Sequence, residues 1–148
     1  MPPAFRVTRD PIDPAALLRD TVAPSDGAAL LFWGVVRDEH DGRPVAHLEY
    51  EAYAPMAEAK LREIADEART RWATGEISVV HRVGRLEVGE ASVAIVVASP
   101  HRAEAYEASR YVIEELKRRV PVWKREGYVD GETEWVPGFI PLAEGGQT

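Results

Sequence analysis

Apolar residues recur along the chain at two spacings, one typical of strands and one typical of helices. Residues 45–53 alternate between apolar and polar side chains, which predicts a strand with one buried face. The continuous apolar run at 28–36 predicts a strand buried on both faces, and the β-branched run at 91–98 predicts a core strand. Shorter extended segments are expected at 5–8, 76–83, 122–126 and 133–136, with a bend at 84–89.

Three segments combine a helical spacing of apolar residues with signals for the start or end of a helix. Asp13 precedes Pro14, a pair that favours an N-cap followed by the first helical residue. Ser99 is placed to cap the last helix, which must end before Pro121 because proline disfavours helical geometry in the residue ahead of it. The predicted helices span 14–20, 55–72 and 100–119.

The order of these elements is irregular, and some neighbouring strands are placed to form hairpins. That order predicts an α+β fold with a mixed or antiparallel sheet and about three helices. A chain of 148 residues with 45% hydrophobic and 29% charged residues is typical of one globular domain. We expect this domain to span 1–137, and we expect the glycine-containing tail at 138–148 to be flexible.

Charge and composition argue against several classes of protein. The net charge of -7 and the pI near 5.1 disfavour general nucleic-acid binding. The chain has no cysteine, which excludes disulfides, thiolate metal sites and a cysteine nucleophile and fits a reducing compartment. The N-terminal residues lack an apolar signal core, and no apolar run is long enough to span a bilayer, so we expect a cytoplasmic protein.

The sequence contains no pattern typical of a bound metal or nucleotide cofactor. Its four histidines lack the spacing of metal ligands, and neither a phosphate-binding P-loop nor a dinucleotide-binding glycine motif occurs. We therefore expect a site built from side chains alone, without a metal or a cofactor.

Positive charge is concentrated at 117–125, where five of the chain's 18 basic residues fall within nine positions. An acidic protein that gathers positive charge in one place usually presents it to an anion. Lys117 falls in the last turn of the predicted helix and Lys124 follows the break at Pro121, so we expect the two lysines to converge. Cations in a last helical turn also complement the helix dipole, but that effect does not account for Lys124. Grouped cations depress each other's pKa, which is one route to a reactive lysine.

Two further positions carry positive charge where the local structure does not require it. His101 and Arg102 lie at the start of a predicted helix, where acidic residues are favoured, and an anion bound there would offset the cost. Arg37 ends an apolar strand, and strand ends commonly carry binding groups on a rigid scaffold. The alternative for each of these residues is a solvated position on the surface.

Several stretches of the chain resemble the large, catalytic subunits of molybdopterin synthase. EAYAPMAEAKL at 51–61 and EARTRW at 67–72 agree with that family, and the resemblance covers about residues 3–137. The principal matching motifs are GVVR at 34–37, HRVGRLEVGE at 81–90, SPHR at 99–102 and LKRRVPVWKRE at 116–126. The motif at 116–126 is very specific.

The resemblance implies an α/β hammerhead fold and a sulfurtransferase of molybdenum cofactor biosynthesis. It implies a homodimer at the centre of a heterotetramer, with a small ubiquitin-like sulfur-carrier subunit docked on each end. The C-terminal Gly-Gly thiocarboxylate of that partner enters a pocket of the large subunit and donates sulfur. The implied substrate is cyclic pyranopterin monophosphate (precursor Z), and two sulfur transfers give the dithiolene of molybdopterin.

The resemblance also implies which residues form the site, with Lys117 and Lys124 as the catalytic pair. A phosphorylated substrate and an anionic partner tail agree with the excess of positive charge at these positions. The absence of cysteine agrees with sulfur that is supplied by a partner. The implied substrate-binding residues are Val35, Val36, Arg37, His101, Arg102, Lys117, Lys124, Arg125 and Glu126.

If residues 100–119 form one helix, the site residues at its two ends are too far apart to belong to one site of one chain. Fifteen residues separate Arg102 from Lys117, which is roughly 22 Å along a helix at ~1.5 Å per residue, and a pterin phosphate cannot bridge that gap. We therefore expect a site shared across a two-fold interface, with Lys117, Lys124 and Arg37 from one protomer and His101 and Arg102 from the other. The alternatives are a helix that breaks early, or another purpose for His101 and Arg102.

Two other interpretations of the basic cluster are open from the residues alone. One is a non-catalytic module that binds an acidic peptide tail, and the other is an RNA-binding surface around Arg118 and Arg119. The net charge of -7 argues against RNA. Alanine at Lys117 separates the first from an enzyme, because a module loses binding whereas an enzyme loses turnover with its partner still bound.

Overall fold

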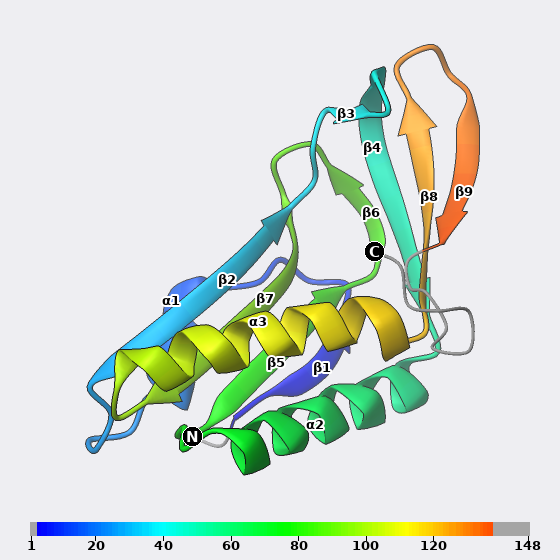
Figure 1. Ribbon diagram of the computed structural model, residues 1–148. Helices are drawn as coiled ribbons and strands as arrows, with labels where there is room; N and C mark the ends of the chain where they lie inside the picture. Colours follow the sequence, from blue (N-terminus) through cyan, green and yellow to red (C-terminus); the bar gives the residue numbers. More distant parts are fainter. Residues whose placement is uncertain (1–2, 138–148) are drawn as a thin grey trace.

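Two β-sheets and three helices form the part of the chain that the structure describes (Figure 1). The computed structural model describes residues 3–137, so the tail at 138–148 lies outside the described residues. The expected α+β class is confirmed. The helices are α1 (Pro14–Thr21), α2 (Ala54–Arg71) and α3 (Arg102–Arg119).

The first sheet has helices on both of its faces. Its strand order is β1-β5-β7-β2, and β1 runs parallel to β5 while the other pairs are antiparallel, so the sheet is mixed as expected. α2 and α3 lie side by side across one face, and α1 lies on the other (Figure 1). The strands are β1 (Phe5–Thr8), β2 (Ala28–Val35), β5 (Ile77–Arg82) and β7 (Ala91–Ser99).

The second sheet rises beyond the C-terminal end of α3 (Figure 1). Its order is β3-β4-β8-β9, with β6 also paired to β4, and all of these pairs are antiparallel. β8 starts just after Pro121, so the chain passes from helix to strand at the predicted break. The strands are β3 (Glu39–His40), β4 (Arg43–Ala52), β6 (Gly84–Glu87), β8 (Val122–Tyr128) and β9 (Thr133–Pro137).

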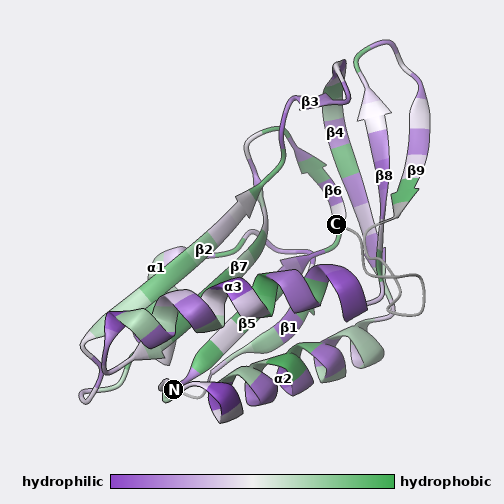
Figure 2. Ribbon diagram, viewed as in Figure 1, coloured by the Kyte–Doolittle hydropathy of each residue, from purple (hydrophilic) through white to green (hydrophobic). Residues whose placement is uncertain are grey.

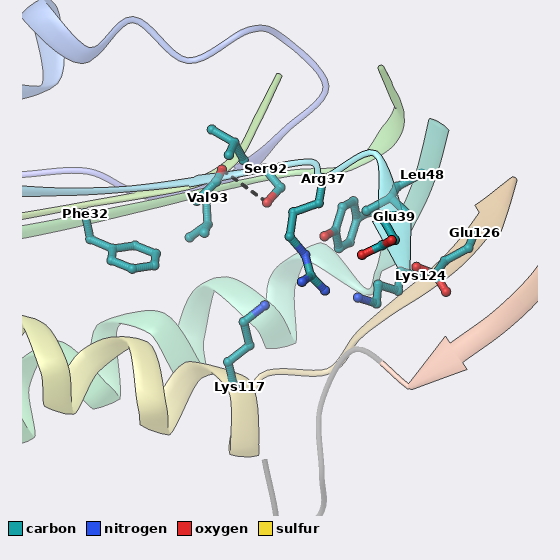
Figure 3. Close-up of a pocket in the computed structure, with 12 residues that line it drawn as sticks. Phe32, Arg37, Glu39, Leu48, Ser92, Val93, Lys117, Lys124 and Glu126 are labelled. Carbon is teal, nitrogen blue, oxygen red and sulfur yellow. Dashed lines mark hydrogen bonds between the residues drawn. The ribbon is translucent and has the colours of Figure 1, made fainter. Parts of the chain in front are cut away.

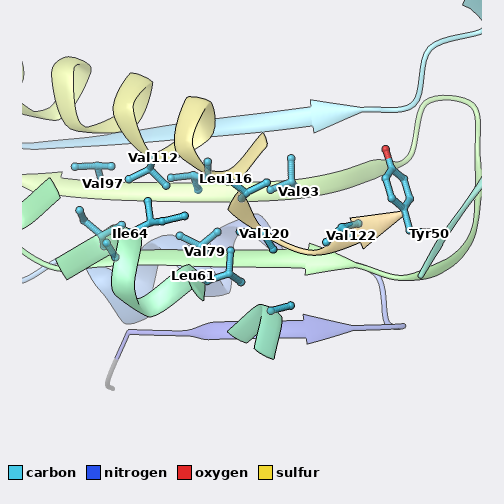
Figure 4. Close-up of a cluster of buried hydrophobic side chains, with 14 of the residues drawn as sticks. Tyr50, Leu61, Ile64, Val79, Val93, Val97, Val112, Leu116, Val120 and Val122 are labelled. Atoms are coloured by element: carbon cyan, nitrogen blue, oxygen red, sulfur yellow. The ribbon is translucent and has the colours of Figure 1, made fainter. Parts of the chain in front are cut away.

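The alternating side chains of β7 fill both sides of the first sheet. Val93, Ile95 and Val97 belong to the large core beneath α2 and α3 (Figure 4), whereas Ala94 and Val96 belong to a smaller core beneath α1. Every residue of β7 is buried, which confirms the predicted core strand. Figure 2 shows the matching pattern, with hydrophobic stretches along β2 and β7 and hydrophilic residues at the C-terminal end of α3.

Two predictions about strands are wrong. Residues 28–36 are not buried on both faces. Within residues 3–137, β2 is an edge strand that pairs only with β7, and Trp33 and Val35 are 37% and 48% exposed. The expected bend at 84–89 contains the strand β6, because the backbone of Gly84–Glu87 pairs with β4. Both errors concern pairing between distant segments, which a local pattern does not report.

The predicted start of α1 is confirmed, whereas the predicted start of α3 is wrong by two residues. Asp13 caps α1, since its Oδ1 accepts hydrogen bonds from two backbone N–H groups of the first turn at 3.1 and 3.2 Å. α3 begins at Arg102 rather than residue 100, and its N-cap is His101 rather than Ser99. Ser99 is the last residue of β7 and pairs with Ala28 of β2, so its backbone is held in the strand.

Arg119, at the end of α3, joins α3 to α2 through ion pairs with three carboxylates. Its Nη1 lies 2.6 Å from Glu67 Oε1 and 3.1 Å from Glu115 Oε1, and its Nη2 lies 2.9 Å from Glu63 Oε2. The hydrogen bond from Arg119 is the largest cause that lowers the pKa of Glu67 to about 2. Arg119 is therefore occupied in packing the two helices, which argues against its use in an RNA-binding surface.

We expect Arg119→Ala to lower the free energy of unfolding by about 1–3 kcal/mol. The change leaves three carboxylates without their shared cation, and the loss is smaller than for a fully buried pair because Glu63 and Glu67 are partly exposed. Urea denaturation measures the difference. Arg110→Ala is the matched control, because Arg110 is exposed and pairs only with Glu114 one turn away, so a loss below about 0.5 kcal/mol is expected. Equal losses in the two variants would contradict this account.

Candidate active site

A pocket of about 200 Å³ lies where the C-terminal end of α3 meets both sheets (Figure 3). Its walls come from strands of both sheets, from the segment after β2 and from the last turn of α3. It therefore depends on the long-range packing of the two sheets. The lining residues are Phe32, Gly34, Val35, Arg37, Glu39, Leu48, Tyr50, Ser92, Val93, Lys117, Lys124 and Glu126.

Three cations converge on this pocket from three parts of the chain. Lys117 comes from the last turn of α3, Lys124 from β8 and Arg37 from the segment after β2, and their charged ends point toward one another in Figure 3. Tyr50 of β4 lies in register with Lys124, which fixes the lysine at this edge of the pocket. None of the three cations has an ion pair with another described residue. Unpaired cations in a concave site attract an anion.

Lys117 differs from an ordinary surface lysine in its protonation. Burial lowers the pKa of Lys117, and the positive charge of Lys124 lowers it further. A lysine with a lowered pKa has a larger fraction of neutral amine near neutral pH than a solvated one. Such a group can donate or accept a proton during a reaction, or stabilise a developing negative charge as an ammonium ion.

Glu126 brings a buried carboxylate to the same pocket. Its side chain is 3% exposed, its Oε1 accepts a hydrogen bond from the Tyr128 hydroxyl at 3.0 Å, and its Oε2 lies 3.5 Å from His40 Nδ1. These contacts hold the carboxylate in place beside Lys124, two residues away on the same face of β8. A carboxylate fixed in this way can accept hydrogen bonds from N–H groups of a ligand.

His81 of β5 lies behind the pocket wall and is buried. Its ring meets the ring of Tyr50 edge to face, with centroids 5.1 Å apart, and its Nδ1 lies 2.7 Å from the carbonyl oxygen of Arg82. Burial is the main cause that lowers the pKa of His81 to about 4, and the charge of Lys117 acts in the same direction. The imidazole is therefore neutral at neutral pH.

The buried imidazole predicts a pH dependence of stability. Since the folded-state pKa of His81 is about 4 and the ordinary value is 6.5, the unfolded chain binds more protons between these pH values. The free energy of unfolding therefore falls as the pH drops from about 6.5 to about 4, and His81 contributes roughly 3 kcal/mol of that loss. Denaturation at a series of pH values, compared with His81→Phe, measures this contribution. Parallel curves for the two proteins would show that His81 is not its source.

The structure places the other site residues implied by the resemblance in three different environments. Val35 lines the pocket, but Val36 points into the core and is 3% exposed. Arg125 lies on the opposite face of β8, where its Nη2 is 2.6 Å from Glu49 Oε1.

His101 and Arg102 lie at the other end of α3. Both are exposed, and with Gly27, Ala28 and Pro100 they line a separate hollow of about 400 Å³. α3 is continuous from Arg102 to Arg119, so an early break of the helix does not bring them to Lys117.

Sequence reasoning missed several residues of the pocket wall. Tyr50 and Leu48 were expected only as the buried face of a strand, and Ser92 only as part of a core strand. Gly34 belongs to the GVVR motif, but its role is steric: a Cβ there would lie 2.7 Å from a methyl group of Val93. The position of Gly34, three residues before Arg37 near the end of a strand, is a usable signal, whereas Ser92 offers none.

The described residues contain neither a membrane-spanning helix nor a metal site. No helix within residues 3–137 is long and apolar enough to cross a bilayer. No group of three or more histidine or acidic side chains within the same range could hold a metal ion.

Comparison with known proteins gives a consistent result across most of the chain. The MoaE protein family matches residues 7–119. The chain is 44% identical over 132 residues to the molybdopterin synthase catalytic subunit of Halalkalibacterium halodurans, which covers 89% of this chain and 84% of the relative. It is 42% identical to the protein of the same name from Bacillus subtilis, with 89% and 83% covered.

Solved structures agree with these relatives. The structure of molybdopterin synthase from Staphylococcus aureus matches with a TM-score of 0.85 and 42% identity, over 89% of this chain and 96% of that chain. A complex of subunits 1 and 2 of the molybdopterin-converting factor from Helicobacter pylori matches with a TM-score of 0.75 and 21% identity, over 95% and 96%. At that identity the second match supports the fold alone.

Proposed function

Because the chain belongs to the MoaE protein family, whose curated relatives are molybdopterin synthase catalytic subunits, we propose that it converts cyclic pyranopterin monophosphate to molybdopterin. The chain is an enzyme subunit of molybdenum cofactor biosynthesis. Two sulfur atoms come from the C-terminal Gly-Gly thiocarboxylate of a small sulfur-carrier subunit. The observation that carries the proposal is the convergence of Arg37, Lys117 and Lys124, without ion pairs to described residues, on one pocket.

The pocket suits the charges of both proposed reactants. The pterin carries a phosphate and the partner's tail ends in a thiocarboxylate, and both are anions that unpaired cations attract. The chain has no cysteine, so it cannot carry the sulfur as a persulfide. The absence of that group, together with the two lysines, supports direct transfer from the partner to the pterin within the pocket.

The two lysines take different parts in this reaction. In each transfer the thiocarboxylate sulfur forms a bond to a pterin carbon while an oxygen substituent leaves that carbon with the electron pair of the C–O bond. Water then cleaves the bond between that sulfur and the acyl carbon, so the partner leaves as a carboxylate. Attack on the acyl carbon places negative charge on its oxygen, which the Lys117 ammonium stabilises or protonates. Lys124 positions the pterin and helps to lower the pKa of Lys117.

Arg37 holds the substrate phosphate together with His101 and Arg102 of a second chain. Arg37 lies at the pocket, whereas His101 and Arg102 lie at the far end of an unbroken helix, roughly 22 Å from Lys117 at ~1.5 Å per residue. A two-fold homodimer brings the far end of one protomer's α3 to the pocket of the other and gives two composite sites. With a small subunit at each pocket, the assembly is a heterotetramer, and the reducing cytoplasm is its compartment.

A sulfur-transfer assay tests the proposed function. The purified chain is mixed with the thiocarboxylated small subunit and precursor Z, and mass spectrometry follows both the partner's C-terminus and the pterin. We expect the partner to change from thiocarboxylate to carboxylate as sulfur appears in the pterin. Binding of the partner without any loss of thiocarboxylate would instead support a non-catalytic module that binds an acidic tail.

A further inference from the structure

Tyr128 is a buried tyrosine behind the proposed active site that the reaction above does not use. It is the last residue of β8 and is 5% exposed, and it is not one of the described residues that line the pocket. Lys124, Glu126 and Tyr128 alternate along the strand, so their side chains lie on one face of the sheet. The tyrosine hydroxyl lies 3.0 Å from Oε1 of Glu126, and Glu126 does line the pocket (Figure 3). Tyr128 therefore borders the pocket through this carboxylate.

Two carboxylates compete for the single hydrogen of the Tyr128 hydroxyl. Burial and the hydrogen bond to Glu126 raise the pKa of Tyr128 to about 12, so the hydroxyl keeps this hydrogen at neutral pH. Glu126 Oε1 lies 3.0 Å from the hydroxyl, whereas Glu134 Oε2 lies 3.4 Å away. The Glu134 side chain is 58% exposed and pairs with Arg43, so it has other partners, whereas a buried carboxylate loses more when it is left unpaired. The hydrogen therefore points to Glu126.

Arg43 holds the ring of Tyr128 in the orientation that this bond requires. Its guanidinium carbon lies 3.5 Å from the centre of the ring, which is a cation–π contact. The guanidinium is itself tied to the segment after β8, because its Nη2 lies 3.4 Å from Asp130 Oδ2 and 3.1 Å from Glu132 Oε1. The backbone N–H of Tyr128 donates to the carbonyl oxygen of Glu132 at 2.8 Å, so the ring and the backbone are anchored to the same segment. The Tyr128 hydroxyl is therefore a fixed donor.

The bond to Tyr128 is the shortest polar contact of the Glu126 carboxylate among the described residues. The other oxygen, Oε2, lies 3.5 Å from Nδ1 of His40, and that contact is an ion pair only when the imidazole is protonated. A glutamate side chain has several rotatable bonds, and a fixed donor at one oxygen removes much of that freedom. Each carboxylate oxygen has two lone pairs, so the bond to Tyr128 leaves others that can accept hydrogen bonds from a ligand.

We infer that Tyr128 is a positioning residue for substrate binding, because its hydroxyl fixes the Glu126 carboxylate in the direction from which it accepts hydrogen bonds from N–H groups of the pterin. The inference rests on the proposed function in taking the pterin as the ligand of this pocket. A carboxylate that is already ordered does not have to be ordered when the pterin binds. Loss of the hydroxyl should therefore weaken pterin binding, whereas the rate of sulfur transfer to bound pterin, which depends on Lys117, should change little.

Tyrosine labelled with ¹³C at Cζ shows which carboxylate receives the hydrogen, without any substrate. The chain has five tyrosines, and the Cζ resonance of Tyr128 is compared in the wild type, in Glu126→Gln and in Glu134→Gln. Glu134→Gln is the matched control, because it makes the same chemical change within reach of the hydroxyl but at a residue that does not line the pocket. We expect the resonance to shift in Glu126→Gln and to stay near its wild-type position in Glu134→Gln. An equal or larger shift in Glu134→Gln would overturn the inference.

A double-mutant cycle tests whether the hydroxyl acts through Glu126. The kcat and the KM for precursor Z are measured in the wild type, in Tyr128→Phe, in Glu126→Gln and in the double variant. We expect Tyr128→Phe to raise KM about tenfold with kcat little changed, which is the lower end for loss of a hydrogen bond to a charged group. Once Glu126 has been replaced, the same change at Tyr128 should add little, because the two residues act as one unit.

The outcomes of these experiments separate the inference from the proposed function. An unchanged KM in folded Tyr128→Phe, or an equal effect of this change with and without Glu126, would overturn the inference and leave the proposed function standing. If Tyr128→Phe does not fold, the Cζ resonance in the wild type and the two glutamine variants decides. A wild type that transfers no sulfur would refute the proposed function, and the Cζ comparison would still report the hydrogen bond.

Discussion

Replacing Lys117 with alanine is expected to abolish molybdopterin formation at saturating substrate while the protein stays folded. A positioned proton donor typically contributes about 10²–10⁴-fold to a rate, and removal of an oxyanion-stabilising group costs a similar factor. The fold should tolerate the change, because Lys117 makes no ion pair or hydrogen bond with a described residue that would lose its partner. Single-turnover sulfur transfer and thermal unfolding together measure the two effects.

Lys60→Ala is the matched control for this experiment. Lys60 lies on the exposed side of α2 and pairs only with Glu63 one turn away, so its loss removes a lysine without touching the pocket. We expect normal turnover in this variant and normal binding of the small subunit in both. Near-wild-type turnover in Lys117→Ala would end the assignment of Lys117 as a catalytic residue.

Mixing two inactive variants is expected to restore activity. Lys117→Ala damages the pocket half of each composite site, and Arg102→Ala damages the half that the other protomer supplies. A heterodimer of the two has one intact site and one doubly damaged site. With free subunit exchange and equal amounts, half of the dimers are heterodimers, so about a quarter of wild-type activity should return.

A second mixture shows whether restored activity reports a shared site. Lys117→Ala and Lys124→Ala damage the same half of the composite site, so each of the two sites in their heterodimer lacks one lysine. No activity should return in that mixture. If exchange is confirmed by mass spectrometry and the Lys117→Ala and Arg102→Ala mixture stays inactive, His101 and Arg102 have another purpose.

Local sequence patterns predict most of the helices and strands but not which strands pair with one another. Asp13 and Pro14 predict the start of α1 because capping depends only on adjacent residues. The run at 28–36 is misleading because apolar β-propensity is the same for an edge strand and a central one. Trp33 and Val35 are exposed because β2 lies at the edge of its sheet, next to β7.

Some residues of the candidate site could likewise be predicted from the sequence, and others could not. Lys117, Lys124 and Arg37 could be predicted, because charge at a helix end, after a proline and at a strand end is unusual enough to notice. Glu39 and Tyr50 could not, since they reach the pocket through the pairing of β3 with β4 and of β4 with β8. No local pattern records that a buried tyrosine will lie beside a lysine 74 positions along the chain.

In the proposed mechanism the thiocarboxylate meets the pterin in the Lys117 pocket. A crystal structure of the Lys117→Ala chain with precursor Z and the thiocarboxylated small subunit tests it most directly, because this variant should trap the complex before reaction. We predict the pterin against Lys124 and Glu126, the partner's C-terminus within the pocket, and the phosphate between Arg37 and the second protomer's His101 and Arg102. A pterin bound elsewhere, or a partner tail that ends outside the pocket, would contradict the account.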